Sequence, residues 1–499
     1  MLQMSKEQIA QYGEENIGEL LTLIQPYLAH REKLYKQYRR KNHENQLMGD
    51  GVKKKIVPFE YYIVNMVQGY IGGKAPMYSV STPTDYALAK NSSGNSDEEK
   101  ADYVKRYTEA IEYIRRYNDD AATYVELVHD YLTTTAAYAY IYENENNEIV
   151  YARFDSRQTV GIYDFETPPN LIGVTRHWKQ KDDKGNDVDV IELITEQHRR
   201  RYNGSKIIDE EELAWDDVPC IALEQPDGIA IFEPAAGEIA AYENNLNNVM
   251  NMTQYNDNAK LLLKSYRFSS DALKMDSAGN MIPNPEREVE EQAIMQAICL
   301  CVGEKGDVAW LTKNVDYTGV LETLKRYHDL ITMLTGVPNM TDEAFANADN
   351  ASALGYKLYA LDQFSATFDR VAKKALLRLW EIITNRLNLK GENFDFRDIN
   401  ITLQRNIPTD KDKSLERALN AYKGNLISQE TALNESQLEV DAKEEMERLR
   451  RETEEDYNAT LQRVQNGQME DGEEEWTMNS TSETIGNTQM SSSLGSTPA

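Results

Sequence analysis

The stretch LTGVPNMTDEAFANADNASALGYK, residues 334–357, shows how the centre of this chain is organised. Gly336 and Pro338 are helix breakers, because glycine accepts left-handed backbone angles and proline lacks the N–H that a helix needs. Small and polar residues follow as far as Asn350, as in a loop. An unbroken helical pattern of apolar residues then runs from Ala351 to Leu389, the longest in the chain. The stretch therefore predicts a flexible loop that leads into a central structural helix.

Two shorter helices are expected before this loop. One spans 233–263 and the other 319–335, and a compact insert over 266–312, with a turn at 276–280, lies between them. Seven asparagines in the first helix lower its intrinsic helicity. An isolated helix of this composition would be marginal in water. We therefore expect neighbours to support it.

The first part of the chain combines helices with a β-meander. Apolar residues recur every three to four positions in the helical parts, and the period changes to two beyond Thr133. Pro26 is expected to divide the first helical part into two helices or to kink it. The expected elements are helices over 5–40, 56–72 and 97–131, a strand over 77–80, a loop over 83–97, and meander strands over 139–142, 149–154, 159–163, 171–178 and 188–195, ending near 219–221.

The C-terminal part is expected to change from folded to disordered along its length. A strand over 394–403 ends before Pro408, and helical patterns follow over 409–422 and 439–464. Ser, Thr, Asn and Gly dominate residues 465–499, a composition that buries too little apolar area to offset the entropy of ordering. The sequence as a whole predicts an α+β fold that is predominantly helical, with a disordered tail.

The charge of the chain is large and unevenly distributed. The 499 residues carry a net charge of −29, which argues against a general nucleic-acid-binding surface because such surfaces are basic. Residues 30–60 hold nine Lys or Arg and four acids, whereas residues 435–476 hold fifteen acids and five bases. This asymmetry indicates different partners, or different positions in an assembly, for the two ends.

The chain is long enough for two to four folding units and shows no membrane or export signal. Apolar stretches such as 293–302 are much shorter than the ~20 residues that span a bilayer. The N-terminus lacks the apolar core and cleavage site of a signal peptide. We therefore expect the protein to stay in the cytoplasm in which it is made.

No motif predicts catalysis, a cofactor or a bound metal. Gly69–Ala75 departs from a phosphate-binding loop, because Gln68 replaces the first glycine and Ala75 replaces the hydroxyl that binds magnesium. A helix C-terminus before a strand explains this stretch. The six histidines have no zinc-binding spacing, and the turns at 182–186 and 276–280 lack the closing glutamate of a calcium loop. The cysteines expected to be buried free thiols are Cys220, Cys299 and Cys301.

Several short stretches occur in a characteristic order along the chain. These stretches are Lys54–Phe59, Gly69–Pro76, Phe232–Pro234 with Ile239–Glu243, Leu334–Pro338 with Asn350–Lys357, and Asn425–Leu433. In this order they resemble the portal family of tailed bacteriophages of the siphovirus type, over roughly residues 9–455. Val52 and Lys53 occupy part of a position where the family usually has asparagine, which is a small departure.

The resemblance implies a fold with wing, stem, clip and crown regions that assembles into a dodecameric ring around a central channel. The implied regions are a wing over 1–233, a first stem helix over 234–263, a clip over 264–317, a second stem helix over 318–335, a tunnel loop over 336–350, a long wing helix and strand over 351–408, a crown over 409–464 and the disordered tail over 465–499.

The resemblance also implies a function without enzymatic activity or cofactor. The ring would stand at one capsid vertex of the virion, serve as the conduit for genome packaging and ejection, and nucleate procapsid assembly. Its implied partners are other copies of itself, the terminase large subunit, the scaffold and major capsid proteins, a head-completion or adaptor protein, and double-stranded DNA that passes without sequence specificity.

The tunnel loop is expected to touch DNA by shape rather than by charge, because a channel that neutralised phosphates would hold the DNA at every step. On the second stem helix, Lys325 and Arg326 either contact phosphates or form ion pairs with a neighbouring stem. The loop residues expected at the channel are Val337, Asn339, Thr341, Asp342, Glu343, Asn347, Asp349 and Asn350.

Two other functions remain open at this point. One is another structural protein of a phage head or tail adaptor, which a closed ring with a central hole in electron micrographs would distinguish from a portal. The other is a nucleic-acid-processing enzyme, for which metal- or ATP-dependent cleavage by the purified protein would be the evidence.

Overall fold

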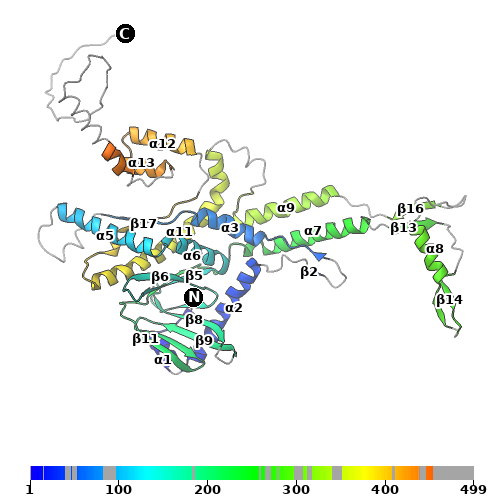
Figure 1. Cartoon of the computed structure of the whole chain (residues 1–499), viewed down its shortest axis with the longest axis horizontal. Coiled ribbons are helices and arrows are strands. Elements are labelled where there is room, and N and C mark those ends of the chain that lie inside the picture. Colours follow the sequence, from blue (N-terminus) through cyan, green and yellow to red (C-terminus); the bar gives the residue numbers. More distant parts are fainter. Residues whose placement is uncertain are drawn as a thin grey trace, which may run out of the picture. The chain divides into compact units, whose positions relative to one another are not determined.

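The structure is a computed structural model of the chain (Figure 1). It describes residues 2–14, 16–39, 46–47, 53–81, 97–181, 185, 187–257, 260–264, 271–277, 280–296, 307–311, 317–339, 351–406, 411–436, 438 and 445–452. The chain divides into two units, residues 1–406 and 407–499, which are described separately. Helices predominate over strands, which confirms the expected class.

The first helices divide at a different place from the one that Pro26 suggests. Helix α1 (Lys6–Glu14) ends before residue 15, and Pro26 lies inside the continuous helix α2 (Ile17–Arg39). One face of α2 is buried against the six-stranded sheet described below, with Leu20 and Ile24 completely inaccessible. This packing keeps the helix continuous, although proline removes one of its backbone hydrogen bonds.

The helix expected over 97–131 is in fact two helices. Helix α5 (Asp97–Tyr117) ends before Asn118, and α6 begins after Asp119, whose φ of 48° is left-handed. The Asn118 side chain donates hydrogen bonds to the Ile114 carbonyl at 2.8 Å and to the Ile149 carbonyl at 3.0 Å. Asn and Asp tolerate this backbone better than other residues, so the break falls at this pair. Helix α6 spans Asp120–Thr134.

The strands between residues 136 and 224 form two sheets instead of a single meander. The smaller sheet has the order β12-β5-β6, and the larger has the order β1-β7-β8-β9-β10-β11, with only the β1–β7 pair parallel among these strands. The strands are β1 (Leu2–Gln3), β5 (Ala136–Glu143), β6 (Ile149–Phe154), β7 (Thr159–Tyr163), β8 (Leu171–Lys181), β9 (Asp187–Ile194), β10 (His198–Asn203), β11 (Lys206–Glu212) and β12 (Cys220–Glu224).

The sequence pattern does not predict β10 and β11, because their residues are mostly charged. The two strands pair through opposite charges, as when Arg200 Nε donates to Glu210 Oε1 at 2.6 Å. Ion pairs across the hairpin therefore replace the apolar alternation on which strand prediction depends.

A buried carboxylate joins three strands of the larger sheet. Glu192 on β9 has no exposed surface and accepts hydrogen bonds from Arg176 at 2.8 Å and from Arg199 and Arg201 at 2.9 Å. Burial tends to raise the pKa of Glu192, but the three arginines outweigh it and hold this pKa below its usual value. Glu192 is therefore ionised at neutral pH and ties β8, β9 and β10 together.

The long central helix has the bounds that the sequence predicts, Ala351–Leu389, and is labelled α11. It packs on β12, and its residues Phe368 and Trp380 are fully buried. After it, the strand expected from 394 begins only at 399, because Asp395 caps a short turn, η2 (Phe396–Asp398). Strand β17 (Ile399–Thr402) then pairs antiparallel with β4 (Met77–Val80).

Residues 236–335 form a second part of the first unit. Helix α7 is shorter than expected, because residues after Asp257 do not continue it and Lys260–Lys264 instead forms a strand paired with Asp307–Leu311. Asparagine and aspartate around 256–258 also favour an end to the helix. The elements are α7 (Ala236–Asp257), β13 (Lys260–Lys264), β14 (Leu273–Met275), β15 (Met281–Pro283), α8 (Pro285–Gln296), β16 (Asp307–Leu311) and α9 (Tyr317–Thr335).

The expected turn at 276–280 is confirmed. The Asn280 N–H donates to Asp276 Oδ1 at 2.8 Å, and the turn joins β14 to β15. We call residues 236–335 the α7–α9 segment, and residues 2–232 with 351–406 the body.

Two labelled helices lie in the second unit. They are α12 (Lys411–Lys423) and α13 (Gln429–Glu435), and Ser428 caps α13 by accepting a hydrogen bond from the Thr431 N–H at 3.2 Å. Of the helix expected over 439–464, only 445–452 is described, and it is helical. The tail expected to be disordered, 465–499, lies outside the described residues.

Candidate functional site

Helices α7 and α9 lie side by side, in the region where the resemblance places the stem (Figure 1). The turn η1 (Glu233–Ala235), directly before α7, contacts both helices. Among the described side chains of the pair, the buried apolar ones are Ile239 near the start of α7 and Ile331 near the end of α9. The two helices are therefore antiparallel, and their apolar anchor lies where α7 begins and α9 ends.

Two buried polar side chains of α7 hold the chain that precedes α3 (Phe59–Gly72). Asn247 accepts a hydrogen bond from the Lys55 N–H at 2.7 Å and donates to the Lys55 carbonyl at 3.0 Å. Glu243 accepts a hydrogen bond from the Val57 N–H at 3.0 Å. This stretch lies outside any helix or sheet, and α7 thereby supplies hydrogen-bond partners for its backbone groups. At Asn247, the asparagine-rich helix is supported by its own chain rather than by a neighbouring subunit.

Phe59 lies where the two helices meet. Its ring centroid is 5.1 Å from that of Tyr242 on α7, edge to face, and 5.9 Å from that of His328 on α9. Edge-to-face aromatic contacts add to the stabilisation that burial gives. The stretch Lys54–Phe59, one of those that carry the resemblance, therefore fixes the α7–α9 pair to the body.

The end of α9 is fixed by a glycine and a buried valine. Gly336 has a left-handed φ of 68°, and a Cβ added to it would lie 3.3 Å from the Ala360 Cβ of α11. Val337 is 2% exposed. This burial places Val337 at the anchored start of the expected loop, and its role at the channel stays a prediction. Asn339 is half-buried, and its side-chain nitrogen lies 3.4 Å from Asp329 Oδ1.

The other predicted channel residues are only partly within the described chain. Lys325 and Arg326 on α9 are exposed, and neither forms an ion pair with another described residue. The structure does not bring them to the buried anchor of the helix pair. The predicted loop residues that lie outside the described residues are Thr341, Asp342, Glu343, Asn347, Asp349 and Asn350.

The helix pair leaves large apolar side chains exposed to solvent. Leu321 and Met333 of α9 are 66% and 67% exposed, and Met250 of α7 is 42% exposed. Apolar surface in contact with water costs roughly 25 cal/mol per Å², so burial of these side chains against another molecule would be favourable. The sequence pattern did not identify these residues, because their helical spacing is the same as that of core residues.

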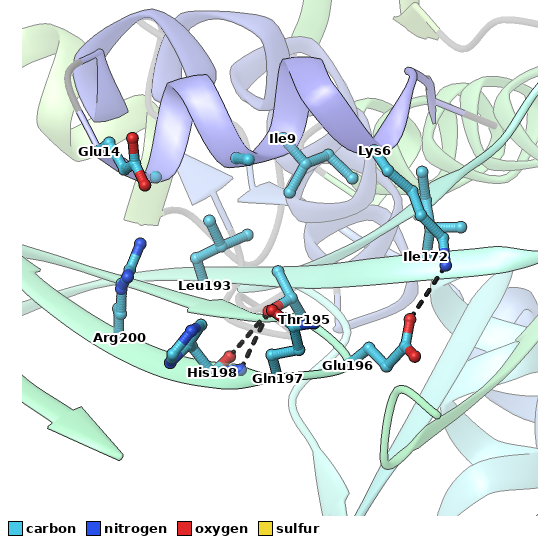
Figure 2. Close-up of a pocket in the computed structure, with 12 residues that line it drawn as sticks. Lys6, Ile9, Glu14, Ile172, Leu193, Thr195, Glu196, Gln197, His198 and Arg200 are labelled. Carbon is cyan, nitrogen blue, oxygen red and sulfur yellow. Dashed lines mark hydrogen bonds and ion pairs between the residues drawn. The ribbon is translucent and has the colours of Figure 1, made fainter. Parts of the chain in front are cut away.

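A pocket that the sequence did not predict lies between α1 and the larger sheet (Figure 2). It has a volume of about 270 Å³, with Ile9 and Leu193 among its apolar lining. The Lys6 ammonium donates to Glu196 Oε2 at 2.9 Å, which links α1 to the loop between β9 and β10. These contacts hold α1 on the sheet, so we assign the pocket a structural role.

The remaining motifs have structural roles as well. Gly72 ends α3 before β4, which confirms the interpretation of Gly69–Ala75 as a helix C-terminus. Cys220 is a buried free thiol, as expected, and burial raises its pKa well above the usual value. Cys299 and Cys301 lie outside the described residues.

Within the described parts of the chain, no three His, Cys, Asp or Glu side chains are grouped so as to hold a metal ion. No described helix is long and apolar enough to cross a membrane.

Comparisons with known proteins identify the family. No curated protein matches the chain. A solved structure titled "Neck of empty GTA particle computed with C6 symmetry" contains a chain that is 13% identical, with 80% of this chain and 93% of that chain covered and a TM-score of 0.38. In another, titled "Virion of native gene transfer agent (GTA) particle", the identity is 12%, the coverage 81% and 92%, and the TM-score 0.36. Residues 10–459, most of the chain, match the family described as "Phage portal protein, SPP1 Gp6-like", and the chain therefore belongs to the SPP1 Gp6-like family of phage portal proteins.

Proposed function

We propose that twelve copies of this chain form a ring at one capsid vertex of a phage particle, through which the genome is packaged and later ejected. The family match over residues 10–459 is the observation that carries this proposal. The exposed apolar residues of the α7–α9 pair support it, because side-by-side copies would remove them from water. Membership of a structural family favours a role in assembly over catalysis.

In this ring, residues 234–263 and 318–335 act as the stem, and residues 264–317 act as the clip. Residues 336–350 act as the tunnel loop and residues 409–464 as the crown. The ring docks the terminase large subunit and later a head-completion or adaptor protein, and it nucleates assembly of scaffold and major capsid protein. Two observations support this order: α7 and α9 pair with each other, and the described strands between them pair among themselves, β13 with β16 and β14 with β15.

Electron microscopy of the purified full-length protein tests the ring directly. We expect closed rings with a central hole, and native mass measurement should give twelve copies. A protein that remains monomeric over a broad range of salt and concentration would contradict the proposal.

A pair of matched variants locates the contact between copies. Leu321→Ser with Met333→Ser removes apolar surface from α9 and should shift rings towards monomers by about tenfold in the assembly constant, from the loss of about 1–2 kcal/mol per copy. Ile208→Ser removes an apolar side chain that is 55% exposed on β11 and should leave the rings intact. Equal effects of the two variants would show that α9 is not the main contact.

The tunnel loop is proposed to touch DNA by shape, and Lys325 and Arg326 lie on the second stem helix. Neutralising Asp342, Glu343 and Asp349 together should change the DNA packaged per particle by less than twofold, whereas a bulky rigid loop in place of 341–349 should block packaging.

The double variant Lys325→Gln with Arg326→Gln distinguishes the two roles proposed for these cations, phosphate contacts and ion pairs between copies. Rings that dissociate at lower salt would indicate ion pairs between copies, and an altered salt dependence of packaging with stable rings would indicate phosphate contacts.

A further inference from the structure

The middle of α11 carries a cationic face, although the chain as a whole is acidic. Residues 370–378 read RVAKKALLR, with four cations and no acid, in a chain whose net charge is −29. Arg378 pairs with Asp217 and, at 2.9 Å, with Glu381. Arg370 and Lys374 are exposed, and neither has an ion pair among the described residues. Because they are four positions apart, these two cations lie on the same face of the helix.

A groove of about 630 Å³ lies along this face. Arg370 and Lys374 line it together with Val371 and Ala375 of α11, and Ile221 of β12 also lines it. Three acids of the lining are already paired, Asp217 and Glu381 with Arg378 and Glu224 with Arg31. Its volume is in the range of sites that bind a small-molecule ligand or a few residues of a peptide. Unlike the pocket beneath α1, this groove therefore combines an apolar lining with cations that lack partners in the described chain.

The chemistry of the groove favours an acidic peptide that also carries an apolar or aromatic side chain. Two cations at a spacing of four residues match carboxylates on a neighbouring segment. The apolar lining requires a partner with apolar groups to bury. A nucleic-acid backbone would satisfy the cations but would place phosphates and sugars against Val371 and Ile221, which gains little.

The chain itself contains a segment with this chemistry. Residues 470–476 read EDGEEEW, with five carboxylates followed by Trp476. We propose that this acidic segment of one copy binds in the α11 groove of another copy, with its carboxylates on Arg370 and Lys374 and with Trp476 on the apolar lining. The inference uses the proposed ring only as the source of a neighbouring copy.

Peptide binding tests the groove without requiring a ring. The receptor is the full-length chain in which the acids of 470–475 are changed to amides and Trp476 to Ala, so that its own segment does not compete. The probe is a fluorescein-labelled peptide of residues 466–480, followed by anisotropy. Arg370→Glu with Lys374→Glu should weaken binding about tenfold, since each exposed ion pair contributes up to about 1 kcal/mol.

Lys373 provides the matched control. It is exposed on the same helix but does not line the groove, so Lys373→Glu should change the affinity less than twofold. A Trp476→Ala probe should bind about fivefold more weakly, because the aromatic ring loses its apolar contacts. Circular dichroism of each receptor variant checks that the surface changes leave the fold intact.

Three results would overturn the inference. The first is absence of peptide binding, and the second is an equal loss with Lys373→Glu, which would indicate a nonspecific charge effect. The third is a duplex DNA of twenty base pairs that binds the receptor more tightly than the peptide does and loses affinity with Arg370→Glu and Lys374→Glu, because the groove would then be a nucleic-acid site.

A cross-link between copies separates this inference from the proposed function. Lys374→Cys in one tagged copy and Trp476→Cys in an untagged copy should form a disulfide-linked pair under mild oxidation, whereas Lys373→Cys should not. Rings without the cross-link would overturn the segment's placement and leave the portal proposal standing. The cross-link in a protein that forms no rings would support the placement and contradict the ring.

Discussion

In the body, Tyr131, Phe368 and Trp380 are almost completely removed from solvent, whereas in the α7–α9 segment Leu321 and Met333 are about two-thirds exposed. The described side chains of the segment include two buried apolar residues, Ile239 and Ile331, while the body contains several dozen. The segment also relies on polar contacts to the body, as at Asn247.

This difference in burial indicates which region is stable in a single copy of the chain and which region needs contacts in an assembly. Burial of apolar area is the dominant favourable contribution to folding, so the body has the means to fold as a single copy. A pair of helices with a short buried contact, and two-stranded ribbons such as β14–β15, are marginal in water without further packing. The segment therefore depends on the body at one end and, in our proposal, on neighbouring copies along its length.

The largest effect is expected for Trp380→Ala in the body. Trp380 has no exposed surface, and its ring packs edge to face on Tyr78 with centroids 5.3 Å apart. Its removal should lower the free energy of unfolding by about 4 kcal/mol, because apolar burial is lost and a cavity remains. Urea denaturation measures this change. The matched substitution Leu321→Ala in the segment should cost less than about 0.5 kcal/mol in a dilute monomer, and a similar cost for both would invalidate the comparison.

The next effect concerns the buried carboxylate of the body. Glu192→Gln should lower the free energy of unfolding at pH 7 by about 3 kcal/mol, because three arginines lose their shared anion. The pKa of Glu192 in the folded protein lies below its usual value of 4.5, so its contribution is fully present above that pH and is lost as the pH falls through the folded pKa.

Unfolding measured at pH 7 and near pH 3.5 tests this assignment. The difference between the natural chain and Glu192→Gln should narrow at the lower pH. A difference that is constant with pH would show that the effect comes from packing rather than from the charge.

A smaller effect is expected where the segment joins the body. Asn247→Ala leaves the Lys55 N–H and carbonyl without their partner and should cost about 2 kcal/mol. Hydrogen exchange at the Lys55 amide measures the local loss of protection. Asn245→Ala is the control, because among the described residues that side chain bonds within α7, to the Ala241 carbonyl, and alanine is the better helix former. If both variants behave alike, Asn247 does not join the two regions.

The smallest effect is expected at the end of α9. Gly336→Ala places a Cβ in a left-handed backbone and 3.3 Å from Ala360, and should cost about 1 kcal/mol. Gly18→Ala in α2 meets no atom within 4 Å and should stabilise the body by about 0.5 kcal/mol. Thermal unfolding should therefore move in opposite directions for the two variants, and a shift in the same direction would contradict the strain at Gly336.

Long periodic elements were predictable from the sequence. The bounds of α11 agree with the expected 351–389, and α3, β4 and α9 agree closely, because breakers such as Gly72 and Gly336 mark their ends. Elements whose bounds depend on pairing with distant residues were not predictable from the sequence. The end of α7 depends on pairing of 260–264 with 307–311, and β10 and β11 depend on arginines and carboxylates that face each other only in the folded sheet.

The candidate site follows the same division. The order of two helices, loop and long helix was visible in the residues and carried the family resemblance. The contact of Asn247 with Lys55 was not visible, because nothing in an asparagine-rich helix indicates which backbone it will meet. The burial of Val337 was not visible for a related reason: an apolar residue after a glycine suits either an exposed loop or a buried anchor, and the packing around it decides between them.

The pairing of β17 with β4 has a consequence for how the chain matures. Val80 on β4 pairs with Ile399 on β17, so this small sheet can form only after roughly 320 further residues have been synthesised. At translation speeds of roughly 5–20 residues per second, the delay is about 15–65 s. During that interval the edge of β4 and the surface later covered by α11 are open on the ribosome, so a newly made chain should be a good substrate for chaperones until its last third has emerged.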